Sequence, residues 1–312
     1  MAVISEVKRK FSANKKTGEN MTYDDPLTVV NAKRECPDCG RVKPEIKSCK
    51  TCDKHGFLPA NISGIWAPSP GFLLCGGPSS NKLPLEKLRE RGIVSLGINN
   101  SAGHIYTNAW IFSDPQEKFH HGLYVDPKIM TFAPIPKLDK RVRVKVGDEF
   151  IWSSTKVMDC PNTYGFDRKT SLYPDKFLKT TYAQWGYGGK QPEDTPFECL
   201  ATMLLGIRMM CYLGCPRIYL LGVDFFRGED AQYSFNQKAR TSNKRYVHET
   251  AMLKSIKPYL KESGIEVFNC NPDTKCDAFD IVSFEDAFED CKGLTPAEPF
   301  DLANWYDKPP KK

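Results

Sequence analysis

Four cysteines near the start of the chain have the spacing of a metal site. Cys36 and Cys39 form one Cys-x-x-Cys pair, and Cys49 and Cys52 form a second pair after a nine-residue spacer. Two thiolates two residues apart bind one tetrahedral Zn²⁺ from a tight turn, and a second such turn completes the coordination. A site closed by four cysteines has no open position for substrate, so we expect this zinc to be structural. His55 is an alternative ligand, and a redox role is the competing interpretation.

A second group of polar residues follows predicted strands in the C-terminal half. The chain from 200 to 272 reads as helix, strand, long loop, helix and strand, with the strands at 217–223 and 265–270. In an open α/β sheet, ligands bind just past the carboxyl ends of the strands. The residues at or near those positions are Asp224, Phe226, Tyr233, His248, Asn271 and Asp273.

The two helices of this stretch have recognisable patterns. The first, around 204–213, is almost entirely apolar, and Gly214 is expected to end it. In the second helix Leu253, Ile256 and Leu260 fall at helical spacing and predict a buried face.

A glycine-rich turn follows an earlier predicted strand. The apolar run 71–75 leads into the turn Gly-Gly-Pro-Ser at 76–79, and a helix is predicted near 84–91. Glycine lets the backbone approach a ligand closely, and N–H groups at a helix start favour phosphate. The turn lacks the Gly-Lys-Ser/Thr ending of a Walker loop, and turns of this kind also occur without a ligand. The candidate ligand contacts are Gly76, Gly77 and Ser79.

Two further predicted strands end in polar residues. The strand at 93–98 is followed by Asn99, and the strand at 109–113 is followed by Asp114. An amide both donates and accepts hydrogen bonds, which suits the recognition of a nucleobase or ribose. The alternative for both residues is a purely local role in a turn.

The stretch from roughly 195 to 272 resembles the second half of the bacterial sialyltransferases of glycosyltransferase family 42. The resemblance recurs at the glycine-rich turn near residue 75 and does not cover the first 65 residues. Flagellin-modifying and pterin-pyrophosphokinase proteins share a similar core. The motifs that carry the resemblance are Leu-Gly-Val-Asp-Phe-Phe at 221–226, Tyr-Ser-Phe at 233–235, His248 at a helix start, and Cys-Asn-Pro at 270–272.

The resemblance implies an α/β fold with a mostly parallel, Rossmann-like sheet, a GT-A variant of sialyltransferase type. It implies transfer of a sugar from a CMP-sugar to a hydroxyl acceptor without a metal. A His at the position of His248 acts as base in that family, and two Tyr hydroxyls stabilise the leaving phosphate; Tyr233 matches one of them. The donor nucleotide is expected to lie against Gly76, Gly77, Ser79, Asn99, Asp114, Thr202, Asp224, Asn271 and Asp273.

Three positions depart from the family pattern. Gly76 and Asp114 each stand where the family has Asn, and Phe226 stands where it has the second Tyr. One contact to the leaving phosphate is therefore missing, and Tyr246 is a candidate replacement. Helix capping is the alternative role for His248.

Two other classes of function remain open. One is Mg²⁺-dependent phosphoryl or pyrophosphoryl transfer to a small metabolite, with Asp114 and Asp224 as candidate metal ligands. The other is a nucleic-acid-associated protein that keeps a degenerate transferase core. Residues 1–60 motivate the second class, because they carry 12 Lys and Arg against 8 Asp and Glu, which is 4 of the chain's net +6.

Composition sets the remaining expectations. No run of 18 apolar residues and no signal-type segment is found, so we expect no membrane span and a cytoplasmic location. The eight cysteines outside the two pairs are expected to be buried thiols.

The alternation in 141–146 predicts a strand, Ser283 is expected to cap a helix, and a strand is expected near 27–30. The predicted organisation is a basic arm at 1–30, a zinc-ribbon or knuckle-like module at 31–65, a transferase domain at 66–300 and a tail at 301–312.

Overall fold

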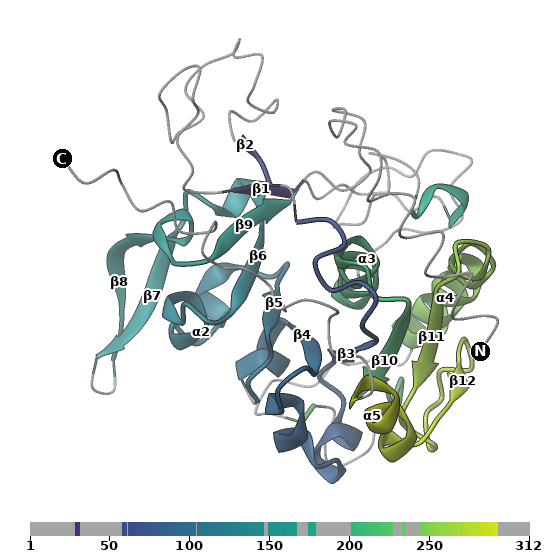
Figure 1. The fold of residues 1–312 in the computed structure, drawn as a ribbon. Helices are drawn as coiled ribbons and strands as arrows, with labels where there is room; N and C mark the ends of the chain where they lie inside the picture. Colours follow the sequence, from purple (N-terminus) through teal and green to yellow (C-terminus); the bar gives the residue numbers. More distant parts are fainter. Residues whose placement is uncertain are drawn as a thin grey trace.

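The main feature of the structure is one ten-stranded sheet (Figure 1). The computed structural model describes residues 29–31, 58–60, 62–103, 105–146, 149–166, 174–178, 201–226, 233–234 and 244–292. In spatial order the strands are β12 (Asp280–Ile281), β11 (Glu266–Asn269), β10 (Arg217–Leu221), β3 (Gly71–Leu74), β4 (Val94–Ile98), β5 (Ala109–Ile111), β6 (Met130–Pro134), β9 (Thr163–Phe166), β1 (Val29–Asn31) and β2 (Leu58–Pro59).

The eight strands from β12 to β9 are parallel, and β1 and β2 are antiparallel to their neighbours. The predicted α/β class with a mostly parallel, Rossmann-like sheet is therefore confirmed. The strand predicted near 27–30 is found at β1. The four cysteines of the predicted zinc site lie between β1 and β2, outside the described residues.

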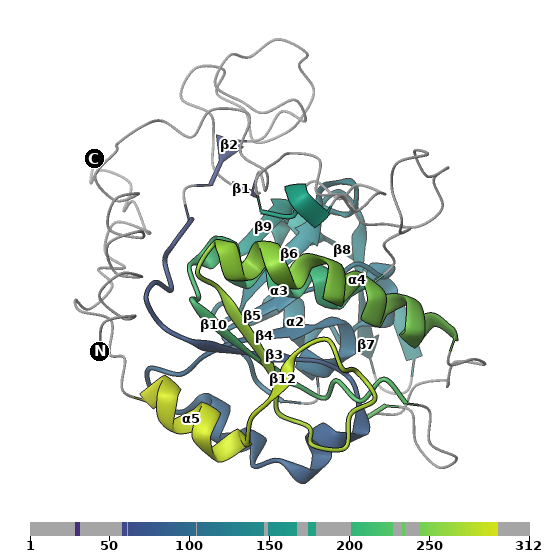
Figure 2. The same ribbon diagram turned by 90° about the vertical axis from the view of Figure 1, so that its right-hand side faces the viewer.

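Both faces of the sheet are covered. α3 (Thr202–Leu213) and α4 (Lys244–Glu262) pack on one face, and α5 (Phe284–Lys292) packs on the other (Figure 2). Strand β3 shows the division, because Leu73 contacts the α3 side while Phe72 and Leu74 belong to the α5 side. A strand buried on both faces reads as a continuous apolar run, and this explains the sequence at 71–75.

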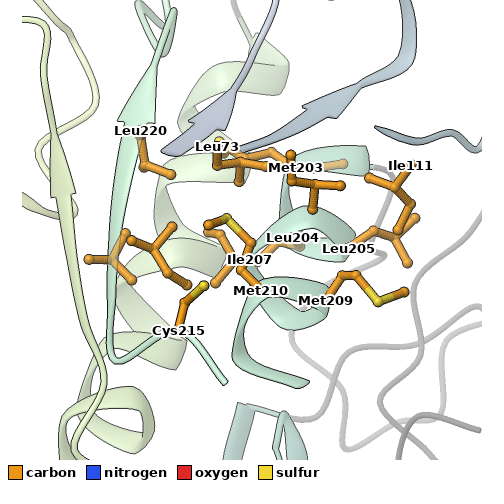
Figure 3. Packing of buried hydrophobic residues seen from close by; sticks show 14 of the residues in the cluster. Leu73, Ile111, Met203, Leu204, Leu205, Ile207, Met209, Met210, Cys215 and Leu220 are labelled. Carbon is orange, nitrogen blue, oxygen red and sulfur yellow. The ribbon is translucent and has the colours of Figure 1, made fainter. Parts of the chain in front are cut away.

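Helix α3 forms the centre of the larger core. Ten of its twelve residues are buried, and its Met and Leu side chains meet Leu73, Ile111 and Leu220 of three strands (Figure 3). Each fully buried side chain of this kind contributes about 1.5–3 kcal/mol relative to an exposed one. Packing therefore holds α3 in place. The predicted end is confirmed, since Gly214 has φ of 97° in the left-handed region.

Helix α4 also follows the prediction. Leu253, Ile256 and Leu260 are each at most 1% exposed, which confirms the predicted buried face. Ser283 caps α5, because its hydroxyl accepts a hydrogen bond from the backbone N–H of Asp286 at 3.0 Å. The seven cysteines in the described part of the chain outside the predicted zinc segment are free thiols, and six of them are buried.

The predicted helix at 84–91 is not an α-helix. The chain after β3 forms two short 3₁₀ segments, η1 (Pro78–Lys82) and η2 (Leu85–Arg89). Pro84 removes a backbone donor and disfavours helical geometry at Leu83, so the segment breaks in two. The glycine-rich turn is thus followed by short 3₁₀ segments and not by an α-helix whose N-terminus would favour phosphate.

The order of the strands creates a switch point. The chain runs from β3 outward through β4, β5, β6 and β9, and then returns to place β10 on the other side of β3. Strands β3 and β10 are neighbours, but the chain continues from β3 to β4 on one side of the pair and from β10 to β11 on the other. Crevices at such points are where open α/β sheets bind ligands.

A separate hairpin joins β6 to β9. It consists of β7 (Arg141–Val146) and β8 (Glu149–Lys156), and it confirms the strand predicted at 141–146. A second apolar cluster under its base includes Val142 and residues around α2 (Gly122–Val125). Within the described residues, no helix is long and apolar enough to cross a membrane.

Candidate functional site

The polar residues singled out in the sequence gather at the carboxyl ends of β3, β4, β10 and β11. These four strands lie in the order β11, β10, β3, β4, so their loops are neighbours at the switch point. The structure places the turn at 76–79 after β3, Asn99 after β4, Asp224 after β10 and Asn271 after β11. The sheet order thus brings together residues from three separate parts of the chain.

Asp224 connects three of these loops. Its Oδ2 accepts a hydrogen bond from the backbone N–H of Ser79 at 2.9 Å, and its Oδ1 accepts one from the Ser79 hydroxyl. The side-chain amide of Asn271 also donates to Oδ1, at 2.8 Å. Three donors from two other loops thus hold the carboxylate, so its first role is to fix the loops relative to one another.

Gly77 and Gly222 allow these loops to touch. The backbone N–H of Gly77 donates to the carbonyl oxygen of Gly222 at 2.8 Å. A Cβ atom on Gly77 would lie 2.5 Å from that oxygen and 2.7 Å from Oδ2 of Asp224. Gly222 has φ of 68°, and a Cβ there would lie 2.6 Å from the carbonyl oxygen of Cys75. The close approach that the glycines permit is therefore between two loops of the protein itself.

The loop after β11 is held by a chain of polar contacts. The Asn271 N–H donates to Oδ1 of Asn269 at 3.1 Å, and the Asp273 N–H donates to Oδ1 of Asn271 at 3.0 Å. The Thr274 hydroxyl donates to the carbonyl oxygen of Val223 at 2.7 Å. Asn271 is buried, whereas Asp273 is exposed at the edge of the group. Both Asn271 and Asp273 are predicted to contact the nucleotide-sugar, and only the Asp273 side chain is exposed to solvent.

Asn99 belongs to a neighbouring polar group, which we call the amide cluster: Asn99, Ser113 and Thr202. The Asn99 amide donates to the Thr202 hydroxyl at 3.1 Å, and the Ser113 N–H donates to Oδ1 of Asn99 at 3.2 Å. The hydroxyls of Ser113 and Thr202 are 2.6 Å apart. Asn99 has φ of 48°, a left-handed conformation that asparagine tolerates better than most residues.

The amide cluster lies at the N-terminus of α3. Thr202 is the first residue of this twelve-residue helix, and Ala201 before it provides no side-chain cap. Backbone N–H groups at such an end attract negative charge. Asn99 is half-buried, whereas Ala201, Thr202 and Met203 at the helix start are buried, so Asn99 lies between the helix start and solvent.

Asp114 lies in a different part of the edge. Its carboxylate is 3.7 Å from Nζ of Lys118, and Lys137 donates to the carbonyl oxygens of Ser113, at 2.7 Å, and Asp114. Asp114 follows β5, which is three strands away from β10. Neighbouring strands are about 4.8 Å apart, so the loops of Asp114 and Asp224 are separated by about 14 Å. In the described part of the chain, no three His, Cys, Asp or Glu side chains gather as a metal-binding group.

Tyr233 is close to the glycine-rich turn. The N–H of its neighbour Ser234 donates to the carbonyl oxygen of Gly76 at 2.9 Å, and Ser234 is buried. The Asn81 amide donates to the carbonyl oxygen of Ser234 at 3.4 Å. The short segment 233–234 is thus anchored on the loop after β3. Gly76 contributes a backbone acceptor where the resembled family has an Asn side chain.

His248 is exposed on α4, beside two residues that face the site loops. Tyr246 stacks on Phe225 with ring centroids 5.2 Å apart, and Glu249 is buried and paired with Arg245. The helix already begins at Lys244, so His248 is beyond its first turn. The prediction that His248 opens the helix is wrong, and with it the expected influence of the helix N-terminus, which falls off within one turn.

Several residues of this region were not found from the sequence. Ser113, Asn81, Thr274 and Glu249 carry no local motif, and only strand order brings them to the site. Cys75 is fully buried at the end of β3, and burial is the main cause that raises the pKa of its thiol, with the charges of Asp224 and Glu249 adding to it. Cys75 is therefore a packing residue and not a nucleophile.

Comparisons with known proteins give one likeness. No family model matches the chain, and no curated protein matches it. Among solved structures, the chain is similar to the MAf glycosyltransferase from Magnetospirillum magneticum AMB-1, with 12% sequence identity and a TM-score of 0.43. The match covers 76% of this chain and 36% of that one, so the chain spans little more than a third of that protein.

The contacts of Asp224 predict its effect on stability. Asp224→Asn replaces one acceptor oxygen by an NH₂ group that must face other donors. We expect the free energy of unfolding to fall by about 1–3 kcal/mol, the cost of leaving such a group unsatisfied. Urea denaturation followed by circular dichroism measures this loss. Asp273→Asn, at an exposed carboxylate in the same region, should change it by less than about 0.5 kcal/mol. Equal effects of the two variants would contradict the linking role of Asp224.

Proposed function

We propose that the protein transfers a sugar from a nucleotide-sugar, of CMP type, to a hydroxyl acceptor by direct displacement. The observation that carries the proposal is the meeting of the loops after β3, β4, β10 and β11 at the switch point. Each of these loops contributes a polar residue of the motifs that resemble family 42. Ligand binding at this edge is the general behaviour of open α/β sheets.

The donor would lie across two adjacent polar groups. The turn at 76–79 and the loop with Asn271 and Asp273 flank Asp224, and the amide cluster lies one strand further along. The N-terminus of α3 beside Asn99 suits the negative phosphate of a nucleotide. Asp114 directly follows Ser113 of the amide cluster, at the end of β5, three strands from β10.

The chemistry requires one base and one group that assists the leaving phosphate. In the proposal His248 takes the proton of the acceptor hydroxyl as its oxygen bonds to the anomeric carbon, and the bond to the nucleotide phosphate breaks. Tyr233, anchored through Ser234 on Gly76, donates a hydrogen bond to the departing phosphate oxygen. The exposed position of His248 leaves it accessible to an acceptor from solvent.

Tyr246 supports this route despite the departure at Phe226. Its ring stacks on Phe225, the residue immediately before the position where the resembled family has its second Tyr. The Tyr246 ring from α4 thus lies next to that position. Phe226 itself is 50% exposed and offers an apolar surface beside the site, suited to the face of an acceptor sugar or base.

The metal-dependent alternative receives less support. One Mg²⁺ binds its oxygen ligands at about 2.0–2.1 Å, whereas Asp114 and Asp224 follow strands three positions apart. The hydrogen bonds from Ser79 and Asn271 also occupy the Asp224 carboxylate. These two aspartates therefore do not form one metal site as placed.

A panel of nucleotides tests the donor class. CMP at 100 times its dissociation constant would stabilise the native protein by about 2.7 kcal/mol through mass action. We expect the melting temperature to rise by several degrees with CMP, and not with UDP or ATP at the same concentration. Stabilisation by ATP with Mg²⁺, and not by CMP, would replace this proposal by phosphoryl transfer.

The second test concerns His248. With the donor identified by the panel, His248→Ala should lower turnover about 10²–10⁴-fold, the usual contribution of a general base. Donor affinity and melting temperature should be unchanged, because the base contacts the acceptor. Val247→Ala, at the 74% exposed neighbouring position, is the matched control with full turnover. A variant at His248 with normal turnover would remove it from the mechanism.

We also propose that Cys36, Cys39, Cys49 and Cys52 hold one structural Zn²⁺. The proposal rests on their spacing, since they lie outside the described residues. The segment that contains them leaves the sheet at β1 and returns at β2, and Val30 and Asn31 pair with Pro59 and Leu58. Both ends of the segment are thus fixed on the sheet, which suits a compact metal-bound module.

Elemental analysis of the purified protein checks the zinc proposal. We expect one equivalent of zinc, lost when Cys36 and Cys49 are both replaced by Ser. Cys211→Ser, at a cysteine of α3 outside the two pairs, should retain the full equivalent. Zinc that survives the double replacement would show that these cysteines are not its ligands.

A further inference from the structure

The hairpin formed by β7 and β8 carries an unusual group of exposed side chains. Phe150, Ile151 and Trp152, consecutive on β8, are 50%, 46% and 53% exposed. In Figure 1 the hairpin lies on the opposite side of the molecule from α4 and β12. It is therefore separate from the candidate site described above, and the proposed transfer reaction does not use these residues.

Arg143 lies over both aromatic rings. Its guanidinium carbon is 4.9 Å from the centroid of the Phe150 ring and 6.0 Å from that of Trp152. Arg143 is the register partner of Trp152, and Lys145 is the register partner of Phe150. The two rings therefore lie on the same face of the hairpin as Arg143. We call Arg143, Phe150 and Trp152 the stacking face.

The acidic residue of β8 lies on the other face. Glu149 pairs with Val146, and side chains alternate between faces along a strand. Glu149 and Ile151 thus share one face, while Phe150 and Trp152 share the other. The segment 140–156 has five Lys and Arg against two Asp and Glu, a net charge of +3. The stacking face combines the positive charge of Arg143 with two accessible rings and carries no acidic side chain of β8.

The hairpin is a firm support because its base is built into the core. Val142 is 2% exposed, and the pairing continues below the strands, where Val157 and Met158 donate to the carbonyl oxygens of Lys140 and Leu138, each at 2.9 Å. Leu138, Val142, Val157 and Met158 all belong to one buried cluster. The strands that carry the rings are therefore anchored at their base before any ligand binds, which lowers the entropy cost of binding.

We propose that the stacking face binds single-stranded nucleic acid. Bases stack on Phe150 and Trp152, and Arg143 and its basic neighbours contact the phosphates. Proteins that bind single strands without strong sequence preference combine these two elements, aromatic platforms and a positive surface that follows the backbone. A duplex is a poorer ligand, because its bases are already stacked on one another.

Two other occupants fit less well. A second copy of the chain would bring two positive surfaces together. A bilayer would meet the carboxylate of Glu149, which directly precedes the exposed run Phe150 to Trp152 on β8. Anionic lipid surfaces repel such a carboxylate. Charge and ring exposure together favour a flexible polyanion that has planar groups.

Binding of a fluorescein-labelled twelve-nucleotide oligothymidine to the full chain tests the proposal by fluorescence anisotropy. Trp152→Ala should weaken binding roughly ten-fold or more, the contribution of one stacked base. Arg143→Ala should also weaken it, and should lower the slope of log K against log salt by about 0.7, the share of one phosphate contact on a single strand. Trp152 is 53% exposed and Arg143 is half-buried on the hairpin surface outside the apolar clusters, so we expect the melting temperature to be nearly unchanged.

Matched controls exist elsewhere on the surface. Arg89 lies over the Tyr106 ring at 5.9 Å, so Arg89→Ala removes an equal charge and a similar cation–π contact away from the hairpin. Ile281→Ala removes another half-exposed apolar side chain, on β12. Both controls should bind the oligonucleotide as the unchanged protein does. The rise in melting temperature with CMP should persist in all four variants. A negative result for oligonucleotide binding can therefore be told apart from a negative result for the proposed sugar transfer.

Three results would overturn the proposal. The first is oligonucleotide binding that neither hairpin variant weakens. The second is equally tight binding of heparin with the same dependence on Arg143 and none on Trp152, which would identify a general polyanion surface. The third is Trp152-dependent sedimentation with phosphatidylserine vesicles in the absence of oligonucleotide binding, which would identify a membrane contact.

Discussion

The hydrogen bonds to Asp224 hold together the part of the molecule on which the candidate site depends. The carboxylate follows β10, and its donors, Ser79 and Asn271, follow β3 and β11. Hydrogen bonds to a charged acceptor are stronger than those between neutral groups, and they also fix direction. Gly77 and Gly222 make the contact feasible because any side chain on either residue would collide with the opposite loop. The anchors of Tyr233 and of α4, at Gly76 and Phe225, lie on these same loops.

The order of the sheet explains why such a contact exists. Because β10 returns to the side of β3, residues more than 140 positions apart become neighbours, as Ser79 and Asp224 show. The same return inserts α3 against β3, β4 and β5, so that Thr202 meets Asn99 and Ser113. Two polar groups thus form side by side at one edge, each assembled from distant segments. A ligand that spans both would contact four loops and be sensitive to their relative positions.

The hairpin lies apart from the Asp224 contacts and rests on a different apolar cluster. Its base belongs to the cluster around Trp110, Phe112 and Tyr124, and Trp110 of this cluster also donates to the carbonyl oxygen of Asn99 at 2.9 Å. The loops around Asp224 are supported by α3, α4 and α5. Changes at Trp152 or Arg143 therefore leave the Asp224 contacts in place. The chain thus has two surfaces of different chemistry, a polar edge at the carboxyl ends of the strands and a hairpin face with two exposed rings and Arg143.

The sequence by itself determined the elements with strong local patterns: strand β10, helix α3 with its end at Gly214, the buried face of α4, and strand β7. It also determined that polar residues follow the strands, because periodicity and glycine positions act within about ten residues. Only the tertiary structure decided that Gly77 faces Gly222, that Asp114 and Asp224 stand three strands apart, and that Glu249 and Tyr246 turn toward the site. Those relations follow from strand order, which non-local pairing and burial select and no local pattern encodes.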